Sequence, residues 1–202
     1  MKRLLVATRN EGKLRELRAL LTVPHVVLET LAQHPLLGDV EETGVTFEEN
    51  ARLKATHAAR NAGVLALGED SGLECDALGG RPGVHSARWA GTHGDDRLNL
   101  EKLLRELAPY DDRSARFVCT VAVATPNGDV VGTARGTCEG RIALAPRGQG
   151  GFGYDPVFLP DAKPGRTMAE LTPDEKSAIS HRGHALRQIV HFLQDAFDTL
   201  DR

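Results

Sequence analysis

The 202-residue sequence predicts an α/β fold that forms one domain, residues 1–202. Near its start, the compact apolar run Arg3–Ala7 leads through a polar turn into leucines at helical spacing. Between residues 117 and 138 the apolar positions instead recur every second residue, which is typical of β-strands. Since strands and helices do not alternate strictly along the chain, the sheet should be mixed rather than purely parallel. No internal repeat or linker divides the sequence.

The first elements should be a strand, a helix and a second strand. Arg3–Ala7 forms the first strand, and four leucines between residues 14 and 21 give the following helix one apolar face. Val26–Leu28 then reads as a short second strand. A strand, a tight polar turn and a helix in this order open many α/β proteins.

A second helix should begin at a capping box and end at a glycine. In this motif the Thr46 hydroxyl accepts the amide hydrogen of Glu49, and the Glu49 carboxylate reaches back to Thr46. The alanine-rich stretch that follows continues the helix to about Ala62. Gly63 should end it, because glycine readily takes the left-handed conformation of a helix C-terminus.

The middle of the chain should add a strand, a helix and a hairpin. Val64–Leu67 is expected to be a strand that delivers Glu69 and Asp70 at its end. A helix follows over Asp95–Leu107, where leucines recur at helical spacing. The hairpin consists of Phe117–Ala124 and Val130–Cys138, because Pro126-Asn127-Gly128-Asp129 between them is a strong turn sequence.

The last third should extend the sheet and end in a long helix. Ile142–Ala145 is a candidate further strand, and a glycine-rich loop follows it. Thr172 and Glu175 form another capping box, with Pro173 at the first helical position. Apolar residues from Leu186 to Leu200 then mark one face of the final helix.

Composition excludes several classes of protein. The apolar fraction is 41% and the formal net charge is −3 with no basic tract, which argues against polymeric nucleic acid as a partner. Charges or prolines interrupt every apolar stretch, so we expect no membrane span, and the run Leu4–Ala7 is too short for a signal peptide. The three cysteines form no C-x-x-C pair and fit buried thiols in a cytoplasmic protein.

A polar turn after the first strand is a candidate phosphate site. The amide hydrogens at a helix N-terminus lack intrahelical partners, and the helix dipole adds partial positive charge there. Gly12 permits close approach of a ligand to the backbone, and Lys13 adds a full charge. The alternative is a capped helix with a surface lysine. The candidate ligand-binding residues are Thr8, Arg9, Asn10, Glu11, Gly12 and Lys13.

Two acidic pairs are candidate metal ligands. Glu41-Glu42 precedes the first capping box, and Glu69-Asp70 follows an expected strand. Magnesium typically binds one or two protein carboxylates together with phosphate oxygens and water. A carboxylate in such a cluster can also act as a general base toward water. The alternative for either pair alone is a solvated surface.

Two later segments could bind a heterocyclic base. Gly148–Gly153 matches G-x-G-x-x-G, but Asp155-Pro156 follows at once, so no helix opens there and a dinucleotide fold is excluded. Phe152 could stack on a base, and Asp155 could accept from ring N–H groups. A second cluster of polar groups consists of Lys176, Ser180, His181 and Arg182. A glycine loop over a buried phenylalanine, and a basic helix end in water, are the structural alternatives.

Taken together and in this order, the motifs resemble the inosine triphosphate pyrophosphatases, which hydrolyse deaminated purine nucleoside triphosphates. The resemblance covers essentially the whole chain. The matching segments are Ala7–Lys13, Glu41–Gly44, Phe47–Ala51, Asp70–Gly72, Gly79–Gly83, Ser86–Arg88, Gly150–Pro156 and Glu175–Gly183. Many relatives have Asp-Asp where this chain has Glu69-Asp70.

The resemblance implies an elongated mixed β-sheet flanked by helices, in two lobes with a central active-site cleft. It also implies a homodimer, a requirement for Mg²⁺, and attack of water on the α-phosphorus of ITP, dITP or XTP. Asp70 and Lys13 would be catalytic, and Glu42 and Asp70 would bind the metal. The substrate-binding residues would be Thr8, Arg9, Asn10, Glu11, Gly12, Lys13, Ser71, Phe152, Gly153, Tyr154, Asp155, Lys176, His181 and Arg182.

Two other functions compete with this interpretation. One is a pyrophosphatase of modified pyrimidine triphosphates, against which the Phe152 loop and the His181-Arg182 pair argue. The other is a nucleotide sensor that binds without hydrolysis, against which the joint presence of Lys13, Glu42 and Asp70 argues.

Overall fold

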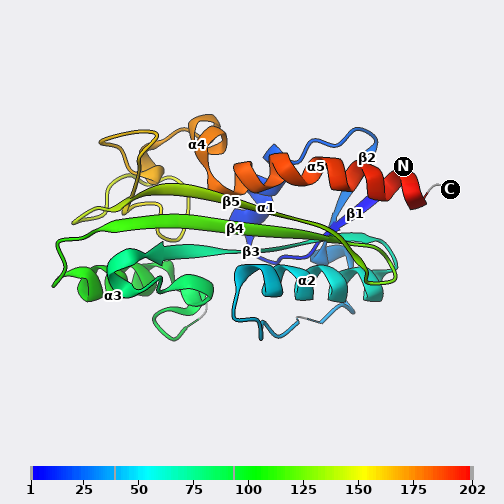
Figure 1. The fold of residues 1–202 in the computed structure, drawn as a ribbon, viewed down its shortest axis with the longest axis horizontal. Helices are drawn as coiled ribbons and strands as arrows, with labels where there is room; N and C mark the ends of the chain where they lie inside the picture. The colour runs from blue at the N-terminus through cyan, green and yellow to red at the C-terminus, as the bar shows by residue number, and fades with distance from the viewer. Residues whose placement is uncertain (1, 39, 93, 201–202) are drawn as a thin grey trace. The chain divides into compact units, whose positions relative to one another are not determined.

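The computed structural model describes residues 2–38, 40–92 and 94–200, and it confirms the α/β class with a mixed sheet (Figure 1). The strand order is β2-β1-β3-β4-β5-β6. β1 pairs in parallel with β2 and β3, whereas β5 pairs with β6 in antiparallel fashion. The strands are β1 (Lys2–Val6), β2 (Val26–Thr30), β3 (Leu65–Cys75), β4 (Ser114–Ala124), β5 (Val130–Ile142) and β6 (Phe158–Pro160). The helices are α1 (Glu11–Leu20), α2 (Phe47–Ala62), α3 (Asp96–Leu107), α4 (Pro173–Ile179) and α5 (His181–Leu200).

The chain divides into two compact units. The first contains the residues up to Asp70, Cys119–Gly136 and those from Arg182 onward, and the second contains Ser71–Val118 and Thr137–His181. The first unit therefore holds α1, α2 and β1 whole, and the second holds α3, α4 and β6 whole.

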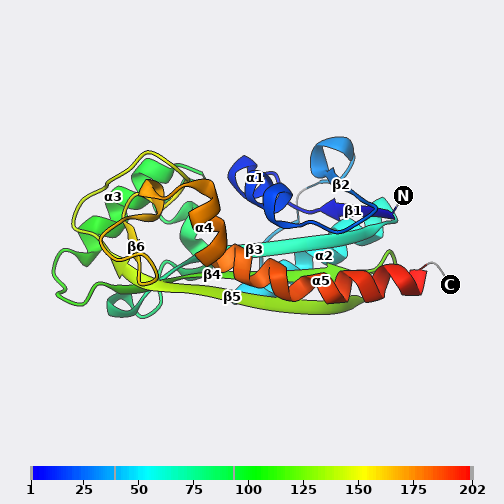
Figure 2. The same ribbon diagram turned by 90° about the horizontal axis from the view of Figure 1, so that it is seen from above.

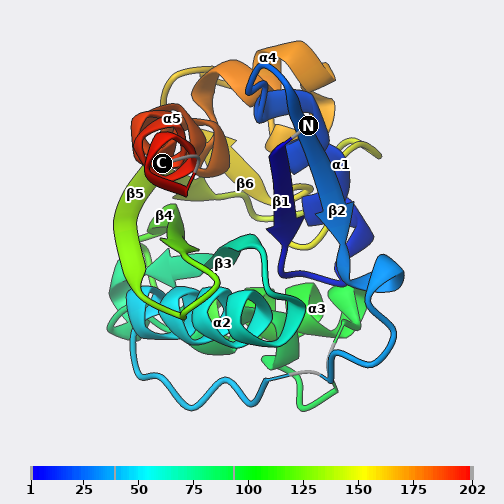
Figure 3. The same ribbon diagram turned by 90° about the vertical axis from the view of Figure 1, so that its right-hand side faces the viewer.

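The first unit has a three-layer core, with the sheet between α2 on one face and α1 and α5 on the other (Figures 1 and 3). Successive residues of a strand point to opposite faces, and β1 shows this directly. Leu4 and Val6 pack with leucines of α1 and α5, whereas Leu5 packs with the alanines of α2.

A glycine in β3 allows the strand to touch α2. A Cβ atom added at Gly68 would lie 2.2 Å from the Ala51 carbonyl oxygen and 2.4 Å from the Ala55 amide nitrogen, so only glycine fits. Ala51 and Ala55 are fully buried here. The close approach brings the face of α2 that carries Asn50 and Lys54 beside the end of the first unit's part of β3.

The second unit has its own core around α3, and long loops surround β6 between β5 and α4 (Figure 2). Leu103 and Leu107 of α3 are fully buried, and Phe117 of β4 packs against Phe158 of β6 with ring centroids 4.4 Å apart. The Tyr154 hydroxyl donates to the Ser86 carbonyl at 2.9 Å, which fixes the glycine-rich loop to this core.

Two sequence predictions about strands were wrong, and one strand was not predicted. Val64–Leu67 was expected to end before Glu69 and Asp70, but β3 continues through both to Cys75. The charged pair stays inside a buried strand because each carboxylate has a cationic partner there. Of Ile142–Ala145, only Ile142 is in a strand, as the last residue of β5, and the three-residue strand β6 was not predicted.

The predicted helix ends are confirmed, with one change at the first capping box. The Thr46 side chain accepts from the Glu49 amide at 3.1 Å, and Gly63 takes the left-handed conformation with φ 66°. The Glu49 carboxylate accepts from the Val45 amide at 2.7 Å, one residue before the expected partner. The second box is complete, since Thr172 and Glu175 bond each other in both directions.

Two predictions from the composition, about the cysteines and about membrane spans, can be compared with the described residues. All three cysteines are buried and free, as the lack of paired spacing predicted. Over residues 2–38, 40–92 and 94–200, none of the helices is both long enough and apolar enough to cross a membrane.

Candidate functional site

The polar turn after β1 is the N-terminal cap of α1. Asn10 accepts the Lys13 amide through its side chain at 3.0 Å, and its own amide donates to the Thr8 hydroxyl at 3.2 Å. Glu11, Gly12 and Lys13 form the first turn of the helix. The capped-helix interpretation therefore describes the local structure, and the same cap leaves the positive end of the helix dipole at this turn.

Two basic side chains leave this turn in different directions. The Arg9 guanidinium donates to the Leu37 carbonyl at 2.9 Å and so ties the turn to a neighbouring loop. The Lys13 ammonium lies 3.4 Å from a Glu69 carboxylate oxygen, with only 15% of its side chain exposed. Lys13 is thus held at the edge of β3. The phosphate role of both residues stays a prediction.

A lysine that the sequence interpretation overlooked joins the two predicted metal ligands. The Lys54 ammonium lies 2.6 Å from Glu42 and 3.1 Å from Asp70, and it also donates to the Glu69 carbonyl at 3.1 Å. Burial alone would lower the pKa of Lys54, but the charges of Asp70 and Glu42 raise it above its usual value. These three residues, the Lys54 cluster, form a site where two carboxylates share one cation.

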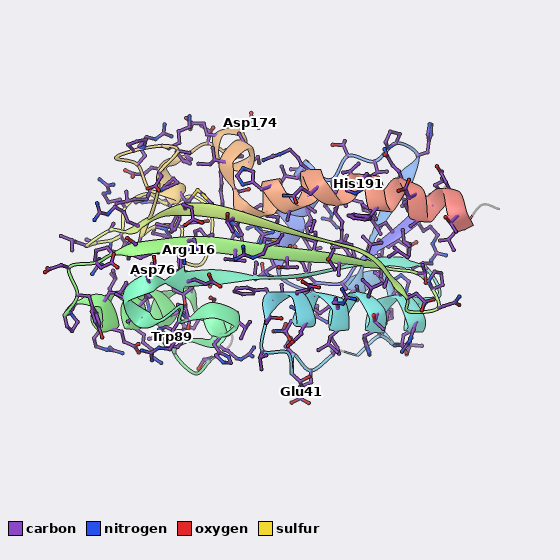
Figure 4. The ribbon with its side chains drawn as sticks, in the orientation of Figure 1. Glu41, Asp76, Trp89, Arg116, Asp174 and His191 are labelled. Atoms are coloured by element: carbon purple, nitrogen blue, oxygen red, sulfur yellow. The ribbon has the colours of Figure 1, made fainter. Side chains whose placement is uncertain are left out.

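Of the two glutamates before α2, only Glu42 reaches this cluster. Glu41 is exposed and points away from α2 at the outer edge of its loop (Figure 4). Glu42 turns inward and keeps only 27% of its side chain exposed. The structure therefore distinguishes Glu42 from Glu41, and the metal role of Glu42 stays a prediction.

The donor set of the Lys54 cluster fits magnesium. Glu42 and Asp70 offer carboxylate oxygens, which are hard ligands of the kind that this ion prefers. A cationic group already lies within hydrogen-bond distance of both, so the pair is spaced to share a positive charge. In the part of the chain that the structure describes, no group of three or more histidine, cysteine or acidic side chains could hold a metal ion. A magnesium ion here would take its other ligands from water and phosphate.

A second cluster of the same charges surrounds Arg182. Its guanidinium makes a two-pronged contact with Glu69, with Nε 3.0 Å from one oxygen and Nη2 2.9 Å from the other, and Nη1 donates to Glu16. Burial alone would lower the pKa of Arg182, but the two glutamates raise it well above its usual value. We call Arg182, Glu69 and Glu16 the Arg182 cluster. It is a fixed tie between α1, β3 and α5.

In the second unit, Asp155 organises the predicted base-binding loop. Its carboxylate accepts from the Lys176 ammonium at 2.5 Å and from the Phe152 amide at 2.8 Å. Lys176 also lies over the Phe152 ring, 5.0 Å from its centroid. Gly151 has φ 73°, and an added Cβ would lie 2.0 Å from Asp155, so the loop requires glycine there. The structure therefore brings these three predicted residues together.

The other predicted residues of the second unit differ in exposure. The His181 ring is buried and stacks on Phe117, with centroids 4.8 Å apart and planes 16° apart. Tyr154 is buried in the core, whereas Gly153 donates its amide to Asp96 at 2.7 Å. Ser71 lies in β3 and is partly buried. The side chain of Tyr154 thus serves packing, and a substrate contact there stays a prediction.

One feature of the sequence, their spacing, could have identified the two overlooked residues. Asn50 and Lys54 are four residues apart on α2, so they share one face of that helix. Both reach Asp70: Lys54 donates to one carboxylate oxygen at 3.1 Å and Asn50 to the other at 3.1 Å. Sequence spacing predicts the shared face but not the strand that it meets.

The fold and these clusters define a class: an α/β protein with a capped helix start, a nearby lysine, and a carboxylate pair suited to a hard cation. Comparison with known proteins agrees with that class. The Ham1 family model matches residues 4–192, and the chain belongs to this family.

Three similar proteins span nearly the same length. The dITP/XTP pyrophosphatase of Geobacillus kaustophilus is 53% identical over 94% of this chain and 93% of its own. The dITP/XTP pyrophosphatase of Streptomyces coelicolor is 49% identical, over 96% and 98%. The structure of a HAM1 protein from Coxiella burnetii is 42% identical with a TM-score of 0.87, over 96% and 100%.

Proposed function

We propose that this chain hydrolyses deaminated purine nucleoside triphosphates, namely ITP, dITP and XTP, to the monophosphate and pyrophosphate. The observation that carries the proposal is the Lys54 cluster, in which Glu42 and Asp70 share one cation. The names of the relatives at about half sequence identity support the same activity.

The first unit would handle the triphosphate. Lys13 and the amide groups at the start of α1 would bind phosphate oxygens, because both present positive charge at one turn. Asp70 would accept a proton from the water that attacks the α-phosphorus. Asn50 and Lys54 each donate to one oxygen of the Asp70 carboxylate, so this general base would be oriented before the substrate binds.

The Mg²⁺ ion would be held by Glu42 and Asp70. When bound, it supplies positive charge that offsets the phosphate oxygens. Lys54 contacts the same two carboxylates, and its ammonium would be free to move toward the substrate's phosphates when another cation shares them. In the free protein Lys54 would offset the charge of the two carboxylates, and in the complex the metal ion would do so.

The second unit would select the base. Phe152 would stack on the purine ring, and Asp155, Lys176 and His181 would face its polar edge. A keto oxygen at C6 accepts hydrogen bonds, whereas the amino group of adenine donates them. Buried donors would therefore favour the deaminated purine, because adenine would leave them unpaired. Arg182 is held by two carboxylates and would fix the start of α5, while its predicted direct contact with the base stays a prediction.

A substrate panel tests this function. Pyrophosphate release is measured with ITP, dITP, XTP, ATP and GTP, each with magnesium and with a chelator instead. We expect release from the first three, little from ATP or GTP, and none under chelation. Equal rates on all five would overturn the selectivity, and binding of XTP without release would favour the nucleotide sensor. Release from modified pyrimidine triphosphates alone would favour the pyrimidine alternative.

We also propose that the chain forms a homodimer and acts in the cytoplasm, on the basis of the family resemblance. Light scattering after size exclusion should give twice the 21.8 kDa mass of the chain. A single-chain mass across micromolar concentrations would contradict the dimer.

A further inference from the structure

One buried asparagine contacts Asp70 of the Lys54 cluster and the loop that carries Glu42. Asn50 lies on α2 and is fully buried. Its side-chain amide donates to Asp70 at 3.1 Å, and its side-chain carbonyl accepts from the Gly44 amide at 2.8 Å. Gly44 is two residues after Glu42 in the chain. Asn50 therefore contacts the predicted base directly and anchors the loop that carries the other carboxylate.

The packing leaves little freedom around this contact. A Cβ atom added at Gly44 would lie 2.6 Å from Oδ1 of the Asn50 side chain. The loop therefore approaches the side-chain amide of Asn50 as closely as a glycine allows. The amide also donates to the Gly44 carbonyl at 3.4 Å. With Lys54 on the second oxygen of Asp70, both carboxylate oxygens have a donor from α2.

A second buried asparagine, Asn99, holds a loop as Asn50 does but, among the residues that the structure describes, has no bond to a carboxylate. Asn99 of α3 is 2% exposed, and like Asn50 it stands four residues after its helix's N-cap residue. It accepts from the Ala90 amide at 2.7 Å and donates to the Ala87 carbonyl at 3.2 Å. Each asparagine thus holds a loop by accepting from one backbone amide and donating to one backbone carbonyl. Only Asn50 adds a bond to a carboxylate.

We propose that Asn50 is a positioning residue for the reaction: it orients Asp70 and holds the Glu42 loop, so that the two carboxylates keep the spacing at which they share a cation. The inference rests on the proposed function. Holding a reacting group in place contributes strongly to rate, and a misplacement of about 1 Å can cost about a hundredfold. The loop clamp alone contributes stability, as it does at Asn99.

The test compares Asn50→Leu with the matched control Asn99→Leu. Both changes remove a buried amide at the same helix position, so both should lower the melting temperature. With dITP and magnesium, Asn50→Leu should lower kcat about a hundredfold with little change in KM. Asn99→Leu should keep kcat near that of the wild type. Equal kcat values for the two variants, whether both high or both low, would overturn the proposal.

A double variant separates positioning from a general structural effect. In the Asp70→Asn background, Asn50→Leu should lower kcat no further, because the group that it orients is gone. A further large loss there would contradict action through Asp70. If Asn50→Leu does not fold, Asn50→Ala replaces it, since alanine is smaller and also removes the donor to Asp70. That variant should show the same loss in kcat, and a kcat near wild type would overturn the proposal.

A structural readout keeps this inference distinct from the proposed function. If the wild type releases no pyrophosphate from any substrate, the proposed function fails, and crystal structures of the variants then decide the positioning role. We expect Asp70 to rotate and residues 41–44 to shift in the Asn50→Leu variant. An unmoved Asp70 carboxylate and loop would overturn the proposal whatever the activity.

Discussion

The Lys54 cluster and the Arg182 cluster each place a cation between two carboxylates, and Glu69 of the second also lies 3.4 Å from Lys13; the clusters differ in burial and in the kind of cation. Arg182 and Glu69 each expose 1% of their side chains. Lys54 exposes 13% and Glu42 27%, while the third member of each cluster, Asp70 and Glu16, exposes 6% and 18%. A guanidinium forms a rigid fork that matches one carboxylate at two points, whereas an ammonium is a mobile point charge on a flexible stem.

The difference indicates two functions for one charge pattern. Arg182 and Glu69 are almost fully buried and held in a fixed geometry, so displacing the guanidinium by a metal ion would leave the buried guanidinium without its partner. Lys54 and Glu42 are more exposed than Arg182 and Glu69, and the cation of the Lys54 cluster is an ammonium on a flexible stem. Glu69 and Asp70 are neighbours in β3, and we propose that these adjacent carboxylates divide two roles: Glu69 secures the fold and Asp70 takes part in the chemistry.

The largest expected effect is on the rate of the Asp70→Asn variant. Removing a general base typically costs about 10²–10⁴-fold in rate, and kcat for dITP should fall by that factor. The amide keeps the shape and one acceptor for the α2 donors, so substrate binding should largely survive. Steady-state kinetics measure both quantities. A kcat near that of the wild type would show that Asp70 is not the base.

The next effect is on stability, in the Arg182→Met variant. It leaves the Glu69 carboxylate buried without its principal cation, which typically costs about 3–5 kcal/mol of the free energy of unfolding. Urea denaturation followed by circular dichroism measures the change. A loss as small as that of an exposed ion pair would show that the Arg182 cluster does not secure the fold.

Adding Glu69→Gln to Arg182→Met should recover part of that loss. The double variant no longer buries an unmatched carboxylate, and removing both partners of a buried pair is far less damaging than removing one. The same denaturation experiment compares the single and double variants. A double variant less stable than Arg182→Met would contradict the role assigned to the ion pair.

A smaller effect, on the free energy of unfolding, is expected from the Lys54 cluster at alkaline pH in the absence of metal. The pKa of Lys54 is raised above its usual 10.5, so its ion pairs contribute stability below that pH and lose it as the pH rises through the raised pKa. Unfolding free energies of the wild type should therefore fall more steeply above pH 10.5 than those of Lys54→Met. Parallel curves would show that these ion pairs contribute nothing to stability.

Local features of the fold were predictable from the sequence, and distant partnerships were not. The caps at Thr46 and Thr172 and the stop at Gly63 depend on residues within one helical turn, so their motifs sufficed. The predicted length of β3 was too short. The strand continues through Glu69 because Arg182, 113 residues away in the sequence, pairs with that buried carboxylate. No spacing rule reveals such a partner.

The candidate site divides in the same way. The sequence predicted two acidic pairs, the family resemblance singled out Glu42 and Asp70 from them, and the structure adds that one cation lies between these two. Lys54 and Asn50 were overlooked because their importance arises from Gly68, which lets β3 touch α2. That contact is a property of the packed helix and strand, and neither segment shows it alone.

The most direct test of the contrast compares Asp70→Asn with Glu69→Gln, the same change from carboxylate to amide at neighbouring positions of β3. For each, kcat with dITP and the free energy of unfolding are measured on one preparation. We predict that Asp70→Asn loses most of its rate and little stability, whereas Glu69→Gln loses more stability and far less rate. If Glu69→Gln loses as much rate as Asp70→Asn while remaining as stable as the wild type, the division between the two clusters is wrong.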